Sequence, residues 1–279
     1  MRKISPRNPW TAAGMSLLLP GFGQIYNGEV NKAIWLFLCF ALLSVPGIAL
    51  VALYLPGPWM APTLALGLAA TLSLWLYGAV DAWREAKSRP DHELRDWQVS
   101  GMYLLVLLAC NFVILPSLIG YVRAHDVEAL RIPSRSMEPA VLKGDFIFAD
   151  KRYNCPGCKH AIHRGDIAIF TYPNNRTLLY IKRIVALPGD QVTLGRSGIE
   201  VNGKPLADPA GSGAVPLPEQ TVTVPPGQVF VLGDNRRESV DSRNFGCVPM
   251  QDVVGKARQV WFSLGPEGVR WNRIGHLLR

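Results

Sequence analysis

The chain has 279 residues, of which 49% are hydrophobic and only 18% are charged, and its mean hydropathy is positive. These values exclude an ordinary soluble globular domain as the first hypothesis for the whole chain. The net charge of +8 comes from scattered residues, so it favours attraction to anionic lipid head groups over nucleic-acid binding.

Residues 1–123 are predicted to form a membrane region. A hydrocarbon layer of about 30 Å takes roughly 20 apolar residues, and three stretches are that long: 33–53, 59–80 and 101–122. The segment 9–26 is also apolar, but Pro20-Gly21-Phe22-Gly23 interrupts it. This interruption favours an interfacial or re-entrant segment over a fourth span. The apolar stretches extend far beyond the length of a removable signal peptide and are therefore expected to be anchors.

The distribution of basic residues predicts the orientation of these spans. The short link 54–58 carries no basic residue, whereas basic residues precede the first span and separate the second from the third: Arg2, Lys3, Arg7, Lys32, Arg84, Lys87, Arg89 and Arg95. The positive-inside rule places both basic segments in the cytoplasm. Three crossings then leave residues 124–279 outside the cytoplasm.

The second part of the chain, 124–279, is predicted to be all-β. Short runs of β-branched and aromatic residues alternate there with Gly, Pro and Asn, without sustained helical periodicity. The expected strands are 146–151, 166–172, 178–186, 191–194, 199–201, 220–224, 229–232 and 253–263. The pair Asn202-Gly203 predicts a tight hairpin.

Ser136 and Lys182 suggest a nucleophile and its base. A serine hydroxyl needs a neighbour that takes its proton, and a lysine can do so near neutral pH only when desolvation lowers its pKa. Lys182 stands in an apolar run, Leu178 to Val185, that could provide this burial. Taken alone, Ser136 could equally be a turn serine, and Lys182 a strand lysine whose ammonium reaches solvent.

Arg183 follows Lys182 and would point to the opposite face of a strand. Both faces are otherwise apolar, so periodicity does not choose between the two cations. Chemistry does, because a guanidinium stays protonated whereas a buried ammonium loses its proton readily. Arg183 then requires a carboxylate partner, since an unpaired buried charge is costly.

Four sequence blocks carry a resemblance to a known family. They are IPSRSMEP (132–139) with GDF (144–146), RGDIAIF (164–170), YIKRIVALPGD (180–190) and GDNRRESVDSR (233–243). In this order they resemble the type I signal peptidase (leader peptidase) family, whose members cut signal peptides with a serine-lysine dyad. The resemblance implies an α-helical transmembrane anchor followed by an all-β catalytic domain with a signal-peptidase-like mixed β-sheet fold.

The resemblance also implies roles for individual residues. Ser136 would be the nucleophile and Lys182 the general base, with Ser134 in the oxyanion hole and Ser239 orienting Lys182. The implied ion pairs join Arg183 to Asp234 and Arg243 to Asp241. The residues implied to line shallow substrate pockets are Ile132, Met137, Val141, Tyr180 and Ile181. The chain departs from many relatives at Arg135 and at Arg237-Glu238, which changes the rim of the site and removes no chemical group.

A serine-histidine-carboxylate triad is the main chemical alternative. The five histidines do not fall in a recognisable triad motif, although triad partners can be distant in sequence.

A second possible site is formed by Cys155-Pro-Gly-Cys158 with His160 and His163. It admits a disulfide-closed loop, a zinc site of all four side chains, or a redox-active pair. An exported domain experiences an oxidising compartment, so a structural Cys155–Cys158 disulfide is favoured. A tetrahedral zinc site would be crowded within nine residues, and a redox pair lacks its usual βαβ context.

The combined interpretation is a membrane-bound serine endopeptidase of the bacterial inner membrane, with its catalytic domain on the periplasmic side. It would cleave signal peptides from exported preproteins through an acyl-enzyme, without a cofactor. Its expected partners are preproteins, membrane lipids and the secretion machinery, and not nucleic acid. One alternative is a serine-lysine peptidase dedicated to a single substrate such as a conjugative pilin. Another is an inactive membrane scaffold or metal or redox module built around Cys155 to His163.

Overall fold

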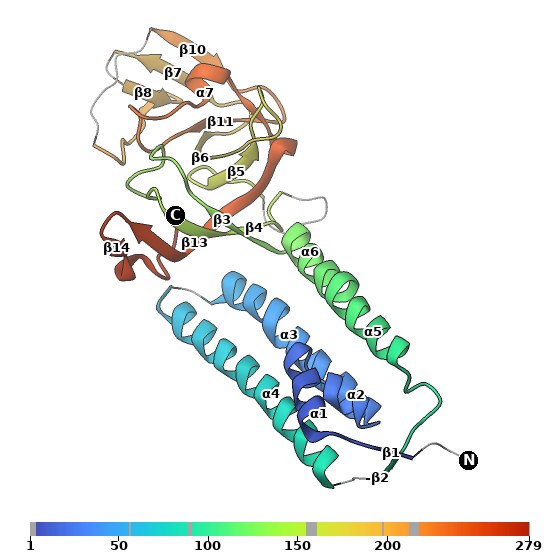
Figure 1. Ribbon diagram of the computed structural model, residues 1–279. Helices are drawn as coiled ribbons and strands as arrows, with labels where there is room; N and C mark the ends of the chain where they lie inside the picture. Colours follow the sequence, from blue (N-terminus) through green and yellow to red (C-terminus); the bar gives the residue numbers. More distant parts are fainter. Residues whose placement is uncertain are drawn as a thin grey trace. The chain divides into compact units, whose positions relative to one another are not determined.

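Long apolar runs of the N-terminal part form helices. The computed structural model describes residues 4–55, 57–88, 91–154, 161–196, 198–211 and 218–278. The chain divides into a helical unit, residues 1–51 with 62–122, and a β unit, residues 52–61 with 123–279 (Figure 1). The helices are α1 Pro9–Leu18, α2 Phe22–Tyr26, α3 Val30–Tyr54, α4 Met60–Ser88, α5 Ser100–Leu108 and α6 Leu115–His125. The short strands β1 Ile4–Pro6 and β2 Asp91–Glu93 pair antiparallel.

Three helices among the described residues are long and apolar enough to cross a membrane: Val30–Tyr54, Gly57–Ser88 and Ser100–His125. The second includes the 3₁₀ turn η1 Gly57–Trp59 before α4, and the third joins α5 to α6 through the π-helical turn η2 Ala109–Ile114. Each covers one predicted span and extends beyond it, because helical backbone continues into flanking polar residues. By contrast, α1 and α2 have 10 and 5 residues. At about 1.5 Å per residue, neither is long enough to cross the hydrocarbon layer.

The α1–α2 hairpin is held to α4 by buried polar groups. Gln24 Nε2 donates to Gly78 O at 2.7 Å and to Asp81 Oδ2 at 3.0 Å. Asn27 Nδ2 donates to Ala82 O at 2.8 Å. A Cβ on Gly23 would lie 2.1 Å from the Ala12 carbonyl oxygen, so glycine permits this close approach. The hairpin is therefore an integral part of the helical unit.

The β unit contains one eight-stranded and one four-stranded sheet. The large sheet has the order β12-β11-β6-β5-β13-β4-β3, with β14 paired to β13, and the small sheet has the order β10-β7-β8-β9. Its strands are β3 Val127–Arg131, β4 Asp145–Asp150, β5 Ile167–Thr171, β6 Leu179–Ala186, β7 Gln191–Gly195, β8 Gly198–Val201, β9 Lys204–Pro205, β10 Gln220–Thr223, β11 Gln228–Leu232, β12 Val248–Pro249, β13 Val253–Gly265 and β14 Gly268–Val269. The pairings of these strands are antiparallel, where the resemblance implied a mixed sheet.

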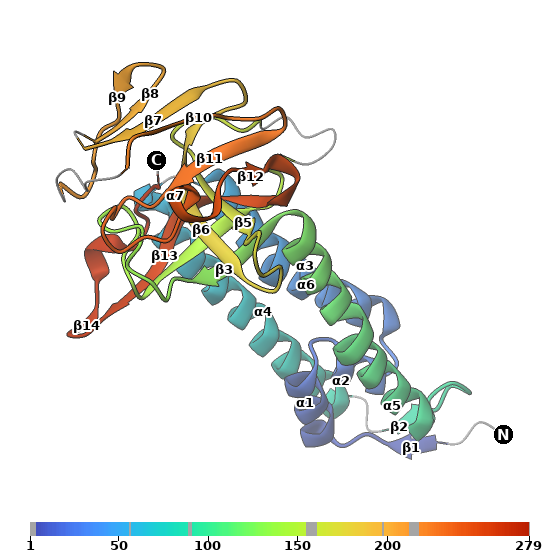
Figure 2. The same ribbon diagram turned by 90° about the horizontal axis from the view of Figure 1, so that it is seen from above.

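The small sheet packs on one end of the large sheet (Figure 2). Val192 and Leu194 of β7 share a buried apolar cluster with Val185 of β6 and Phe230 of β11. A second cluster, which includes Ile132, Met137, Val141 and Ile181, lies beneath the loop that carries Ser136. The two clusters therefore support β6 and β11, the neighbouring strands that carry or adjoin the candidate site.

The predicted fold class, apolar helices followed by an all-β domain, is confirmed. Each predicted strand overlaps an observed one within two residues at its ends, and the Asn202-Gly203 turn joins β8 to β9 with positive φ at both residues. The prediction missed β3, β9, β12, β14 and the short helix α7 Ser242–Phe245. All five have five residues or fewer, and β3 directly follows a long helix, so periodicity has little to act on.

Candidate active site

Ser136 lies in the loop that follows β3, and its side chain is 5% exposed. The adjacent Met137 is fully buried in the apolar cluster beneath the loop, and Val141 N donates to Met137 O at 2.9 Å. Asn235 N donates to the Ser136 carbonyl oxygen at 3.1 Å. The loop is thus fixed on both sides of the serine, by core packing and by a backbone hydrogen bond from a distant segment.

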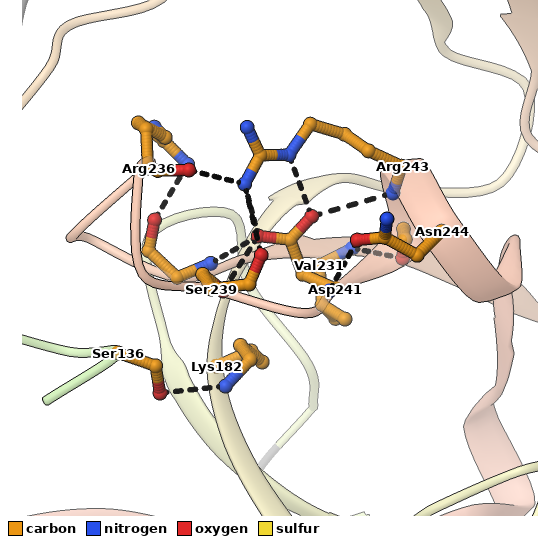
Figure 3. A network of polar contacts seen from close by, with 10 residues as sticks. Ser136, Lys182, Val231, Arg236, Ser239, Asp241, Arg243 and Asn244 are labelled. Atoms are coloured by element: carbon orange, nitrogen blue, oxygen red, sulfur yellow. Dashed lines mark hydrogen bonds and ion pairs between the residues drawn. The ribbon is translucent and has the colours of Figure 1, made fainter. Parts of the chain in front are cut away.

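Lys182 lies near the middle of β6, between β5 and β11, and is 4% exposed. Its Nζ is 2.7 Å from Ser136 Oγ, to which it donates a hydrogen bond (Figure 3). The ammonium also lies 5.3 Å from the centroid of the Tyr180 ring. The structure therefore brings the two residues, 46 positions apart in sequence, into direct contact within a largely water-excluded site.

The surroundings of Lys182 shift its protonation equilibrium toward the neutral amine. Burial lowers the pKa of its ammonium to about 8, while the negative charges of Asp241 and Asp234 partly oppose this shift. Burial is the larger effect because transfer from water removes the hydration of the charged amine. An amine with a pKa near 8 is available as a base close to neutral pH.

Arg183, on the opposite face of β6, forms a bidentate pair with Asp234. Its Nε and Nη2 donate to the two carboxylate oxygens at 2.8 and 2.7 Å, and Nη1 donates to Gly165 O at 2.7 Å. Asp234 is fully buried. The pair joins the segment after β11 to β6, the strand that carries Lys182. Asp234 is the carboxylate partner that the sequence predicts for Arg183.

Asp241 organises the segment 233–244 above the dyad. Its carboxylate accepts hydrogen bonds from Gly233 N, from Ser239 Oγ at 2.7 Å and from the Arg243 guanidinium, and it caps the N-terminus of α7 (Figure 3). Among the hydrogen bonds of the described residues, Ser239 donates to Asp241 and none joins it to Lys182. Ser239 is nevertheless close to the dyad, because a Cβ on Gly233 would lie 2.2 Å from Ser239 Oγ and 2.5 Å from Ser136 O.

Ser134 and the predicted pocket residues differ in how exposed they are to solvent. The Ser134 hydroxyl is 3.3 Å from Ser136 Oγ, and Ser134 is exposed. The buried pocket candidates are Ile132, Met137, Val141 and Ile181. Tyr180 is half-buried and stacks on Tyr172, with ring centroids 4.3 Å apart.

Several supporting residues were missed in the sequence analysis. Gly233 and Asn235 contact the Ser136 backbone, and Tyr172 stacks on Tyr180. Arg236 is buried and donates through Nη1 to Gly233 O at 3.0 Å. The block GDNRRESVDSR contains three of the four, but a backbone amide or a missing Cβ leaves no side-chain signal in a single sequence.

The second predicted site is only partly visible. Cys155, Cys158 and His160 lie outside the described residues. His163 is described: its side chain is 73% exposed, and Nδ1 is 3.7 Å from Asp166 Oδ2. Within the described part of the chain, no group of three or more histidine, cysteine or acidic side chains is arranged to hold a metal ion. The disulfide thus stays a prediction, as does the alternative zinc site.

Comparison with known proteins gives a consistent result. A family model described as signal peptidase, peptidase S26, matches residues 103–262. A signal peptidase I of Pseudomonas aeruginosa is 30% identical over 233 residues, covering 66% of this chain and 82% of that protein. A signal peptidase I of Pseudomonas fluorescens is 30% identical over 250 residues, covering 71% of this chain and 88% of that protein. A crystal structure of a signal peptidase I from Enterococcus faecalis is 32% identical, with a TM-score of 0.30, and covers 34% of this chain and 96% of that one.

Proposed function

Because the chain belongs to the signal peptidase family, peptidase S26, we propose that it is a membrane-bound serine endopeptidase that removes signal peptides from exported preproteins. The observation that carries the mechanism is the 2.7 Å contact between Ser136 Oγ and the buried Lys182 Nζ. Ser136 is the nucleophile and Lys182 the general base.

The reaction begins when the neutral Lys182 amine accepts the proton of Ser136 Oγ as this oxygen attacks the scissile carbonyl carbon. The negative charge that develops on the carbonyl oxygen is stabilised by the Ser136 backbone N–H and the Ser134 hydroxyl. The Lys182 ammonium then protonates the departing amine, which leaves an ester on Ser136. In the second half, Lys182 takes a proton from water, the hydroxyl attacks the ester, and Ser136 recovers its proton.

The segment 233–244 holds the base in place. Ser239 and Asp241 lie above Lys182 as part of one hydrogen-bonded group, and the two ion pairs, Arg183–Asp234 and Arg243–Asp241, keep that group on the lysine strand. Ser239 orients Lys182 when the site is occupied by substrate. In the described residues its hydroxyl bonds Asp241, so this role requires a small rotation of the side chain.

Substrate binds as an extended strand added to an edge of the domain. Small side chains at the first and third residues before the cut enter shallow pockets formed by Ile132, Met137, Val141, Tyr180 and Ile181. Four of these five side chains are already packed in the core, which supports a pocket too shallow for large groups.

The membrane spans 33–53, 59–80 and 101–122 anchor the enzyme in the bacterial inner membrane with residues 124–279 on the periplasmic side. The segment 9–26 lies at the cytoplasmic interface, near lipid head groups. A signal sequence is itself an apolar membrane helix, so anchoring raises the effective concentration of the substrate at the site. The secretion machinery delivers that substrate to the same membrane.

The test is cleavage of a model preprotein by the purified protein in detergent. Ser136→Ala and Lys182→Ala are each expected to reduce the rate by at least about 1000-fold, because the two residues act as one unit. Lys204→Ala is the matched control, since Lys204 is an exposed lysine in the small sheet. Thermal unfolding should show that all three variants are folded. A folded variant at Ser136 or Lys182 that keeps more than a tenth of the activity would refute the dyad.

A further inference from the structure

The helical unit contains an apolar cavity that the peptidase function does not use. The cavity has a volume of about 230 Å³ and lies between α1 and α4, where it is lined by Trp10, Ala13, Ala79, Val80 and Trp83. The two indole rings meet edge to face with centroids 6.2 Å apart. Trp10 is 77% exposed, so the cavity opens beside a large ring that faces outward.

The composition of the cavity limits what can bind. Its lining offers no side-chain polar group except the indole N–H groups, so a polar metabolite would lose its hydrogen bonds with water without replacement. Its volume is also below the range of about 300 to 1,000 Å³ typical of small-molecule sites. A segment of hydrocarbon chain satisfies both limits.

Cations and unsatisfied donors lie around this cavity. Trp83 Nε1 is buried without a hydrogen-bond partner, as are Nε and Nη2 of Arg7. The Lys87 ammonium lies 4.9 Å from the Trp83 ring centroid. Buried donors without an acceptor are uncommon and costly, so an anionic oxygen would be favoured here.

Arg7 lies at the N-terminal end of α1, three residues before Trp10. It directly precedes Asn8, which caps α1, and its guanidinium lies 4.2 Å from the Tyr26 ring centroid. Tyr26 packs on Ala12, Ala82 and Ala86, the small residues that bring α1 and α4 together.

Two acidic residues of α4, Asp81 and Glu85, adjoin these cations. The Asp81 carboxylate accepts from Lys32 and from Gln24, so its charge is already paired. Arg7, Arg84 and Lys87 outnumber Asp81 and Glu85, which leaves a local excess of positive charge.

The cavity lies at a point of α4 whose sequence matches a membrane interface. The apolar run of the helix ends at Val80 and is followed by Asp81, Arg84, Glu85 and Lys87. Tryptophan side chains and cations at the end of an apolar span are typical of the boundary between hydrocarbon and head groups. Given the proposed orientation, this boundary belongs to the cytoplasmic leaflet, whose anionic lipids attract basic residues.

We propose that the cavity between α1 and α4 is a binding site for an anionic phospholipid of the cytoplasmic leaflet. One acyl chain lies over Ala13, Ala79 and Val80, against the paired rings of Trp10 and Trp83, and the phosphate accepts hydrogen bonds from Arg7 and Lys87. This inference rests on the proposed membrane insertion and not on the catalytic chemistry. The α1–α2 hairpin then forms part of a lipid site as well as part of the helical unit.

The full-length protein in detergent tests the site by native mass spectrometry during titration with phosphatidylglycerol. Ala13→Leu fills the cavity, and Trp10→Ala removes one wall. Each is expected to weaken phosphatidylglycerol binding about tenfold, equivalent to about 1.4 kcal/mol. Ala69→Leu is the matched control, because Ala69 is an exposed alanine of α4 that does not line the cavity. Arg7→Gln should remove the preference for phosphatidylglycerol over phosphatidylcholine, whereas Arg95→Gln, at an exposed arginine of the same unit, should not.

The arms of the experiment separate the possible occupants. Glycerol phosphate should fail to displace the lipid, and displacement at similar concentrations would overturn the proposal in favour of a soluble-phosphate site. Wild-type binding by both Ala13→Leu and Trp10→Ala would also overturn it. A change of oligomeric state in these variants without a change in lipid binding would overturn the proposal as well. It would indicate that a second copy of the chain occupies the cavity. Thermal unfolding without lipid checks that the variants are folded, and preprotein cleavage, measured separately, tests the catalytic proposal.

Discussion

At Lys182, opposing electrostatic effects set the chemistry of a single amine. Burial removes hydration from the ammonium and lowers its pKa, whereas the Asp241 and Asp234 carboxylates stabilise the positive charge. Burial prevails, and the pKa of Lys182 is about 8 instead of the usual 10.5. At pH 7 about one amine in ten is then neutral, against fewer than about one in a thousand for an ordinary lysine. In the proposed mechanism, this shift makes the Lys182 amine available to accept the proton of Ser136.

The rate of preprotein cleavage is expected to rise with pH and to level off above about 8. The sign follows from the lowered pKa: the neutral amine is the active form, and its fraction grows as pH passes through that value. Below pH 7 the increase should be about tenfold per pH unit. Single-turnover rates between pH 5.5 and 9.5 measure it. A midpoint near 10.5, or a flat profile, would contradict a buried lysine base.

At the level of elements, β6 and the segment after β11 form the site together. Successive residues of β6 point in opposite directions, so Lys182 reaches Ser136 while Arg183 reaches Asp234. The segment after β11 crosses close above the nucleophile at Gly233, where there is no room for a Cβ. Its close approach allows Asn235 N to bond the Ser136 carbonyl oxygen.

Gly233→Ala is expected to reduce cleavage by at least about tenfold, because misplacement of catalytic groups by fractions of an ångström has large effects on rate. The added methyl group would lie 2.5 Å from the Ser136 carbonyl oxygen, so the nucleophile or Ser239 must move. Gly195→Ala is the control, since a Cβ on Gly195 would lie at an ordinary contact distance of 3.9 Å from Gly198 O. Comparison of kcat with KM would assign the loss to kcat. Wild-type kcat in Gly233→Ala would show that this approach does not position the dyad.

For the whole molecule, the question is how three apolar helices are oriented in a membrane. The two cytoplasmic segments of the proposed topology carry basic residues such as Arg7, Lys32, Arg84 and Lys87, and the link between the first two spans carries none. This asymmetry favours one orientation during insertion. In that orientation the β unit is outside the cytoplasm, where exported preproteins emerge.

Fusions to a reporter enzyme that folds only outside the cytoplasm are expected to be active after Tyr54, inactive after Arg95 and active after Gly275. The reason is that the proposed topology places the link and the β unit outside and the loop before the third span inside. Replacement of Arg84, Lys87 and Arg95 by alanine should reduce the differences in reporter activity between the three fusions, whereas Lys204→Ala in the β unit should have no effect. An active fusion after Arg95 in the unaltered chain would contradict the topology.

Most helices and strands could be predicted from the amino-acid sequence alone, because hydrophobic periodicity and length are local properties. The three apolar helices and the eight expected strands are examples, as is the Asn202-Gly203 turn. Chemistry also separated Lys182 from Arg183, since only one of these cations can lose its proton. The pairing of Ser136 with Lys182 came instead from the resemblance of four blocks, because a single sequence does not specify which distant residues meet.

Features that depend on the backbone and on packing between elements became visible in the three-dimensional structure. The bond from Asn235 N to Ser136 O involves no side chain, and the role of Gly233 lies in an atom that it lacks. The Ser239 hydroxyl bonds Asp241 and not Lys182. This choice depends on the rotation of the Ser239 side chain, which the local sequence does not specify. Likewise, the cavity beside Trp10 and Trp83 exists because small residues let α1 approach α4, and the spacing of two helices far apart in sequence is set by their packing.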